Sequence, residues 1–189
     1  MKPLLLALIL TTTAATAAEQ PRYLPRQDAA ITYRSTGTDP MIPQNLVIRY
    51  FAAADRLRIE GGPLGYLLVD RPMERVEMVM PQPRLVIELP PGGGITDGFI
   101  LSNRLSFTRT GTDQVLGRPC TTYTVTADRA TNAARGQVCL TPDGLLLRGE
   151  GQGRDGRSAR IEATSIALAT QPAGLFTLPD GYKTMSIPR

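Results

Sequence analysis

Apolar and polar residues alternate along most of the chain after residue 45. A period of two places every second side chain on the same side of an extended strand, so this alternation predicts strands with one buried face. In segment 46–51, for example, Leu46, Ile48 and Tyr50 would share a face. The same pattern predicts strands over 56–60, 66–69, 73–80, 84–89, 105–110, 120–126, 135–141, 145–150 and 157–168. The chain is therefore predicted to be mainly β.

Turn-forming residues separate the predicted strands. The turn sequences lie at 70–72, 81–83, 111–113 and 143–144. Residues 90–94 read Pro-Pro-Gly-Gly-Gly, which predicts a connector. One short helix is predicted within Ile95–Arg104, where Thr96 or Asp97 could cap its start. Parallel strands need long crossover connections, usually helical, and the sequence predicts none between strands, so we expect an antiparallel meander.

The first eighteen residues have the composition of a secretory signal peptide. Lys2 supplies a positive charge, residues 4–10 are apolar, and small residues occupy 14–18. The apolar stretch is shorter than the roughly 20 residues that a membrane-spanning helix needs. We therefore predict a signal peptide over 1–18, cleaved near Ala17 or Ala18. Residues 19–189 would form a single exported domain without stable membrane insertion.

The two cysteines are expected to form a disulfide, because an exported chain matures in an oxidising compartment. A hairpin that places Cys120 opposite Cys139 also places Tyr123 opposite Gly136, on the face away from the sulfur atoms. On the sulfur face Thr122 would then lie opposite Gln137, and Thr124 opposite Arg135. A one-residue slip would lose both the cysteine pairing and this sorting of side chains. We therefore predict the disulfide together with this register.

Composition excludes several classes of function. The chain has no His and two Cys, which excludes a Ser-His-Asp triad, a histidine metal site and a cysteine-rich metal cluster within one chain. It carries 21 Lys and Arg against 17 Asp and Glu. The basic residues are scattered along the chain and often lie beside acidic ones. A nucleic-acid-binding protein would instead have them clustered in a stripe or patch. We predict no nucleic-acid partner.

Candidate chemical motifs all have simpler interpretations. Residues 151–156 match G-x-G-x-x-G, but the alternation after them predicts a strand and not the helix of a dinucleotide site. Glu74 and Glu77 are three positions apart, so on a strand they would face opposite sides. Lys183 precedes Ser186, which is the wrong order for S-x-x-K. We predict no enzymatic activity, cofactor or metal.

Three motifs give the chain a resemblance to known proteins. They are V-x-G-x-x-C-T-x-Y over 115–123, the segment 138–148, and the ending F-T-L-P-D-G-Y over 176–182. With these motifs the chain resembles an uncharacterised family of exported bacterial proteins that is similar to the periplasmic lipoprotein carriers LolA and LolB. The resemblance implies periplasmic localisation and an open half-barrel, in which a curved antiparallel sheet holds a helix on its concave side. Phe176 and Tyr182 would fix the C-terminal segment to the body of such a domain.

The resemblance also implies a site on the concave face. If that face is not fully covered, Tyr50, Phe99, Leu101, Phe107 and Tyr123 would line an apolar cavity for a lipid or a lipoprotein acyl chain. A second hypothesis is a structural or assembly partner in the cell envelope, with a filled core and a functional rim. A third is a small hydrolase of unknown type. The sequence assigns no oligomeric state.

Overall fold

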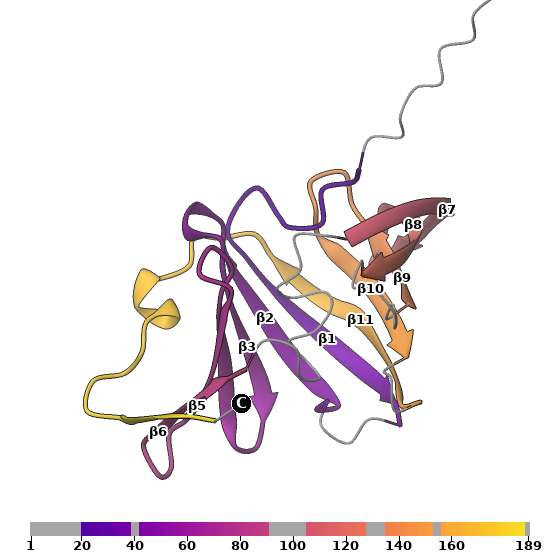
Figure 1. Ribbon diagram of the computed structural model, residues 1–189. Helices are drawn as coiled ribbons and strands as arrows, with labels where there is room; N and C mark the ends of the chain where they lie inside the picture. The colour runs from indigo at the N-terminus through magenta and orange to yellow at the C-terminus, as the bar shows by residue number, and fades with distance from the viewer. Residues whose placement is uncertain (1–19, 39–41, 91–104, 128–134, 153–155, 188–189) are drawn as a thin grey trace, which may run out of the picture.

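The computed structural model describes residues 20–38, 42–90, 105–127, 135–152 and 156–187. Within these residues, twelve strands form one sheet in the order β12-β6-β5-β4-β3-β2-β1-β11-β10-β9-β8-β7. The sheet is strongly curved and open, because its end strands β12 and β7 do not pair with each other (Figure 1). The predicted mainly β, curved and open sheet is confirmed.

Two antiparallel meanders build the sheet. The first consists of β1 (Ala29–Gly37), β2 (Asn45–Phe51), β3 (Arg56–Gly62), β4 (Gly65–Asp70), β5 (Arg75–Met80) and β6 (Leu85–Leu89). The second consists of β7 (Leu105–Val115), β8 (Arg118–Ala127), β9 (Arg135–Leu140), β10 (Leu146–Gln152) and β11 (Ser158–Ala167). Antiparallel pairing of β1 with β11 joins them. We call β2–β6 with β12 the first wing, and β7–β10 the second wing.

The central strand β1 is absent from the strands predicted from the sequence. Its residues Ala29, Ile31 and Tyr33 are each 0% exposed. The Tyr33 hydroxyl donates a hydrogen bond of 2.8 Å to the carbonyl oxygen of Leu146 in β10. Ala163 of the intervening β11 lies directly opposite Tyr33, and its small side chain leaves room for the phenol to cross. Tyr33 therefore ties the centre of the sheet to the second wing.

The C-terminal segment departs from the predicted all-antiparallel meander. Strand β12 (Lys183–Ser186) pairs with β6 in parallel. The crossover between them is the whole second meander followed by the segment after β11, so no crossover helix is needed. The segment contains a 3-10 helix, η3 (Ala173–Phe176), and the Phe176 ring stacks on Phe51 at 5.3 Å between centroids. Tyr182 packs against a small cluster of β4, β5 and β6, so the predicted role of Phe176 and Tyr182 is confirmed.

One predicted turn is wrong. Residues 111–113 lie inside β7, where the register shifts between Arg109 and Gly111. The chain reverses instead at Leu116 and Gly117, whose φ angles are 52° and 72°. Positive φ at both central residues is the geometry that matches the twist of a two-residue hairpin. Gly111 instead lies at a β-bulge within β7.

The predicted disulfide is present, but the predicted register of its hairpin is wrong. The Cys120 and Cys139 sulfur atoms are 2.05 Å apart and their Cα atoms 5.4 Å apart. Tyr123 lies opposite Val138 and not Gly136, a displacement of two residues. A slip of two keeps every side chain on its own face, so the sorting of polar and apolar residues could not distinguish the two registers. Cys139 lies opposite Thr122, so the bridge joins it diagonally to Cys120, two residues along β8.

Some predictions lie outside the described residues. These are the signal peptide at 1–18, the helix within Ile95–Arg104 and most of the connector at 90–94. The helices described in the chain are η1 (Ala52–Ala54) and η3. Neither has the length or the apolar content to cross a bilayer.

Candidate functional site

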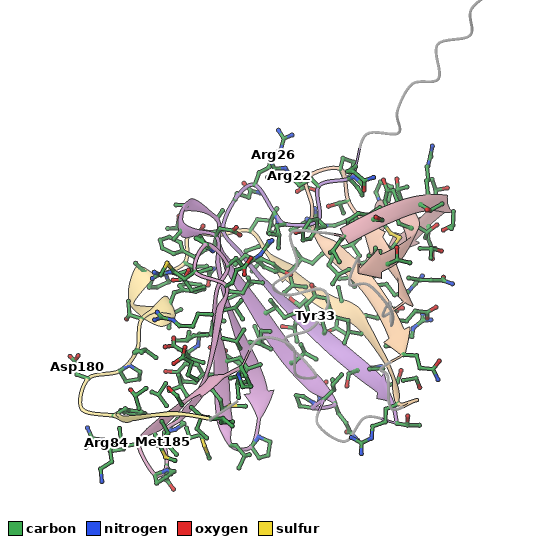
Figure 2. The ribbon with its side chains drawn as sticks, in the orientation of Figure 1. Arg22, Arg26, Tyr33, Arg84, Asp180 and Met185 are labelled. Carbon is green, nitrogen blue, oxygen red and sulfur yellow. A yellow bond between two sulfur atoms is a disulfide. The ribbon has the colours of Figure 1, made fainter. Side chains whose placement is uncertain are left out.

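One face of the sheet carries an unbroken row of apolar side chains across eight strands. Residues directly opposite each other on neighbouring strands point to the same face. The row consists of Ile166, Ile31, Ile48, Ile59, Leu67, Met78, Ile87 and Met185. We call this side the inner face, and the opposite side the outer face. Figure 2 shows Tyr33, two residues from Ile31, between the two wings of the curved sheet.

Burial along this row is greatest at the centre of the sheet and least at the end strand β12. Ile31 is 0% exposed and Ile48 is 8% exposed. Met78 and Ile87 are partly exposed, and Met185 on the end strand β12 is 56% exposed. The centre of the inner face is therefore core, whereas strands β5, β6 and β12 of the first wing leave apolar surface open to solvent.

The open part of the first wing is rich in methionine. We call it the methionine edge, and it consists of Met78, Met80, Leu85, Ile87 and Met185. All are partly or fully exposed. Methionine is flexible and polarisable, so it fills irregular gaps and adapts to different apolar partners. This surface was not assigned to a site from the sequence, although the alternation had placed Met78 and Met80 on one face.

The second wing has its own partly exposed apolar cluster. The Phe107 and Tyr123 rings meet edge to face at 5.9 Å between centroids. The Tyr23 ring lies 5.5 Å from Phe107. These three rings pack against the buried residues Val125, Val138 and Leu140. The hairpin of β7 and β8 therefore supplies two of the predicted site residues, and the segment before β1 covers them with a third ring.

A buried arginine links the two wings at one end of the inner face. Arg71 follows β4 and is 4% exposed. Its Nη2 donates a hydrogen bond of 2.9 Å to the Tyr23 hydroxyl oxygen, and its guanidinium lies 5.3 Å from the centre of the Tyr23 ring. An Asp55 carboxylate oxygen is 3.6 Å from its Nη1. Tyr23 thus contacts Arg71 of the first wing and Phe107 of the second.

The tyrosines in the core are unsuited to proton transfer at neutral pH. Burial raises the pKa of Tyr50 to about 12, against a smaller lowering effect of its hydrogen bond with Tyr33. Burial also raises the pKa of Tyr33 well above its usual value. Both phenols therefore stay neutral, and they hydrogen-bond and pack instead of acting as bases.

The outer face of the first wing carries a charged depression of about 240 Å³ beneath η3. Arg56 pairs with Asp70 at 2.8 Å, and Arg75 with Glu77 at 3.5 Å. Burial raises the pKa of the Glu77 carboxyl, and the Arg75 charge partly opposes this shift. Since each carboxylate has an arginine partner, the geometry is that of a structural charge cluster beneath the C-terminal segment.

A larger, shallow depression of about 550 Å³ lies across β1 and β8–β11. Its lining is mostly polar or glycine, and it includes the Glu150–Arg160 ion pair at 3.2 Å. Nearby, hydrogen bonds from Arg148 and then Arg160 hold the pKa of Glu162 below its ordinary value. These pairs brace the second wing. Among the described residues, no three His, Cys, Asp or Glu side chains gather as metal ligands.

The structure brings together only part of the predicted site. Phe107 and Tyr123 are in contact. Tyr50 is 6% exposed and belongs to the central core, a different cluster. Phe99 and Leu101 lie outside the described residues. Neither depression includes Tyr50, Phe107 or Tyr123 in its lining.

The matches to this chain among known proteins are solved structures of low sequence identity. No protein-family model matches the chain, and no curated protein matches it. Similar solved structures include MucB, with a TM-score of 0.47 and 13% identity over 85% of this chain and 60% of MucB. The chain therefore spans about 60% of the length of MucB.

Two further structures are similar over most of their own length. The Mycobacterium tuberculosis lipoprotein LppX has a TM-score of 0.43 and 14% identity, over 77% of this chain and 88% of LppX. A LolA-superfamily protein from Nitrosomonas europaea has a TM-score of 0.43 and 10% identity, over 82% of this chain and 91% of that protein. The similar structures therefore include a protein of the LolA superfamily, which the sequence motifs also resemble.

Proposed function

We propose that this protein is an exported, non-catalytic binding module that holds a hydrophobic ligand, such as a lipid or a lipoprotein acyl chain, on the inner face of its open sheet. One observation carries the proposal: the apolar row crosses eight strands and is left partly exposed where it reaches the end strand β12. Large exposed apolar patches on a folded domain commonly mark interaction sites. Each Å² of this surface that a ligand covers contributes about 25 cal/mol.

The polar chemistry of the described residues supports a binding role. Carboxylates of the first wing, such as Asp70 and Glu77, are paired with arginines. The inward-facing phenols of Tyr33 and Tyr50 have raised pKa values. A catalytic acid or base near neutral pH would need a less constrained group within reach of a bound substrate.

Native mass spectrometry tests the proposal directly. The protein is purified from its host envelope in a mild detergent and sprayed without denaturation. The expected spectrum contains a species heavier than the mature chain by the mass of one lipid, and organic extraction removes the added mass. Apo protein alone after gentle extraction would contradict the proposal.

The export part of the proposal has its own test. The mature protein should appear in the periplasmic fraction and should begin at Ala18 or Glu19, after cleavage near Ala17 or Ala18. N-terminal sequencing of the fractionated protein measures this. An intact Met1 in the cytoplasmic fraction would contradict export.

A structural or assembly role in the envelope is the second candidate. It is favoured by the packing of the central core, where Ile31, Tyr33 and Leu147 are each 0% exposed. In this case the protein would purify without lipid and together with a protein partner. The same mass spectrum therefore separates the two functions.

A further inference from the structure

Within the strands of the first wing, one inward position carries a charged side chain, apart from the buried Arg71 that follows β4. Opposite residues share a face, which assigns the inward positions of β2–β6 and β12. In these strands the inward residues are apolar or glycine, with Lys183 as the one exception. Lys183 lies directly opposite Leu85, and Leu85 lies opposite Met80. The charge therefore borders the methionine edge.

Acids of the same region point away from Lys183. Glu88 lies opposite Ser186 on the outer face, and its carboxylate accepts a hydrogen bond of 3.1 Å from the Ser186 hydroxyl. Glu77 lies opposite Glu88 and shares that face. In the described part of the chain, no carboxylate lies within ion-pair distance of the exposed Lys183 ammonium group. A cation with no counter-charge among the described residues, beside open apolar surface, complements a molecule with an anionic head and an apolar tail.

The arrangement also gives the tail a direction. Met185 is two residues from Lys183 on the same face, and the row continues inward through Ile87 and Met78. The exposed fraction falls along this path, from 56% at Met185, through the partly exposed Ile87 and Met78, to 6% at Leu67. A tail that starts beside Lys183 would therefore meet increasingly buried apolar surface. Figure 2 places Met185 near the lower edge of the sheet, where solvent can reach it.

We propose that the ligand is an anionic amphiphile that binds at the methionine edge, with its acyl tail along Met185, Ile87 and Met78 and its head group at Lys183. This inference rests on the proposed function and specifies its ligand class and its site. A phosphate or a carboxylate head would satisfy the same ammonium group. Flexible methionines suit acyl chains of different length and saturation.

The experiment uses the mature protein and three probes with the same acyl chain. Lysophosphatidylglycerol and the free fatty acid are anionic, and the monoacylglycerol is neutral. Isothermal titration calorimetry compares the wild type with K183Q, K183R, M185E and L116E. The control L116E also places a glutamate at an exposed apolar residue, since Leu116 is 51% exposed, but in the β7–β8 turn.

The expected results differ between variants. The wild type binds the anionic probes more tightly than the neutral one, and the stronger anionic probe identifies the head group. K183Q weakens anionic binding about two- to fivefold, as expected for one exposed charge pair, and leaves neutral binding unchanged. K183R keeps the preference. M185E weakens all three probes by about tenfold, because the acyl tail loses an apolar contact and would have to cover a carboxylate. L116E binds like the wild type.

Several outcomes would overturn the inference. Equal binding of anionic and neutral probes, or an unchanged preference in K183Q, refutes the head-group assignment. Unchanged binding by M185E, or equal weakening by L116E, refutes the site. A dimer in analytical ultracentrifugation that M185E dissociates would show that a second copy covers this edge instead. If M185E does not fold, M185Q tests the same contact. A wild type that binds none of the probes contradicts the proposed function itself.

Discussion

Removal of the Cys120–Cys139 disulfide should lower the free energy of unfolding by about 3 kcal/mol. The bridge closes a loop between residues 19 positions apart, and the chain-entropy relation for a loop of this length gives that value. The cysteines are 3% and 1% exposed, so replacing both with alanine also removes two buried sulfur atoms and adds to the loss. For a chain of this size, the melting temperature should fall by about 6 to 12 °C.

Urea denaturation followed by circular dichroism measures this loss. The double variant Cys120→Ala/Cys139→Ala is compared with the oxidised wild type. The reduced wild type is the control, because it loses the closed loop but keeps both cysteine side chains. Thiol titration of the oxidised wild type should find no free sulfhydryl. A loss below 1 kcal/mol, or two reactive thiols in the absence of reductant, would refute the reasoning.

Three further substitutions test other parts of the structure. Tyr33→Phe removes the hydrogen bond to the Leu146 carbonyl and should cost about 1–3 kcal/mol in urea denaturation; a neutral result would show that the bond contributes nothing. Phe176→Ala removes a buried ring that stacks on Phe51 and should cost about 3–5 kcal/mol, with faster proteolysis of the C-terminal segment; wild-type cleavage kinetics would contradict this packing role. Because burial raises the pKa of Glu77, its folded-state pKa exceeds its unfolded one, so wild-type stability relative to Glu77→Gln should fall as pH rises from 4 to 7. If the difference in unfolding free energy between the wild type and Glu77→Gln stayed constant across that range, the pKa of Glu77 would not be raised in the folded state.

The alternation of side chains predicted most strands because burial on one face is a local property. Strands β1 and β12 escaped prediction for different reasons. In β1 only Ile31 and Tyr33 are large apolar residues, and the other positions hold alanine, glycine or polar residues. In β12 every residue is exposed, and its extended state comes from pairing with β6, which begins where the Lys183 amide donates to the Arg84 carbonyl at 3.0 Å. Pairing with a distant strand leaves no local pattern.

The predicted site was correct only for Phe107 and Tyr123, because contacts between distant strands leave no pattern in the sequence. Phe107 and Tyr123 meet because β7 and β8, which are neighbours in the sequence, form a hairpin. The sequence placed the turn at 111–113, so it predicted both strands but not the register between them. The separation of Tyr50 from them depends on the β1–β11 pairing that joins the two meanders, and that pairing joins segments more than a hundred residues apart. The methionine edge depends on β12, so it could not be located before the fold was known.

The most direct test of the account places a fluorescent reporter on each face of β12. The chain has no tryptophan, so Met185→Trp and Thr184→Trp each introduce a single one, the first on the inner face opposite Ile87 and the second on the outer face opposite Val86. An acyl chain brominated near its middle quenches tryptophan only at short range. Ligand binding on the inner face should give saturable quenching of the Met185→Trp variant and little quenching of Thr184→Trp. Equal quenching of both variants, or none in either, would contradict ligand binding on the inner face.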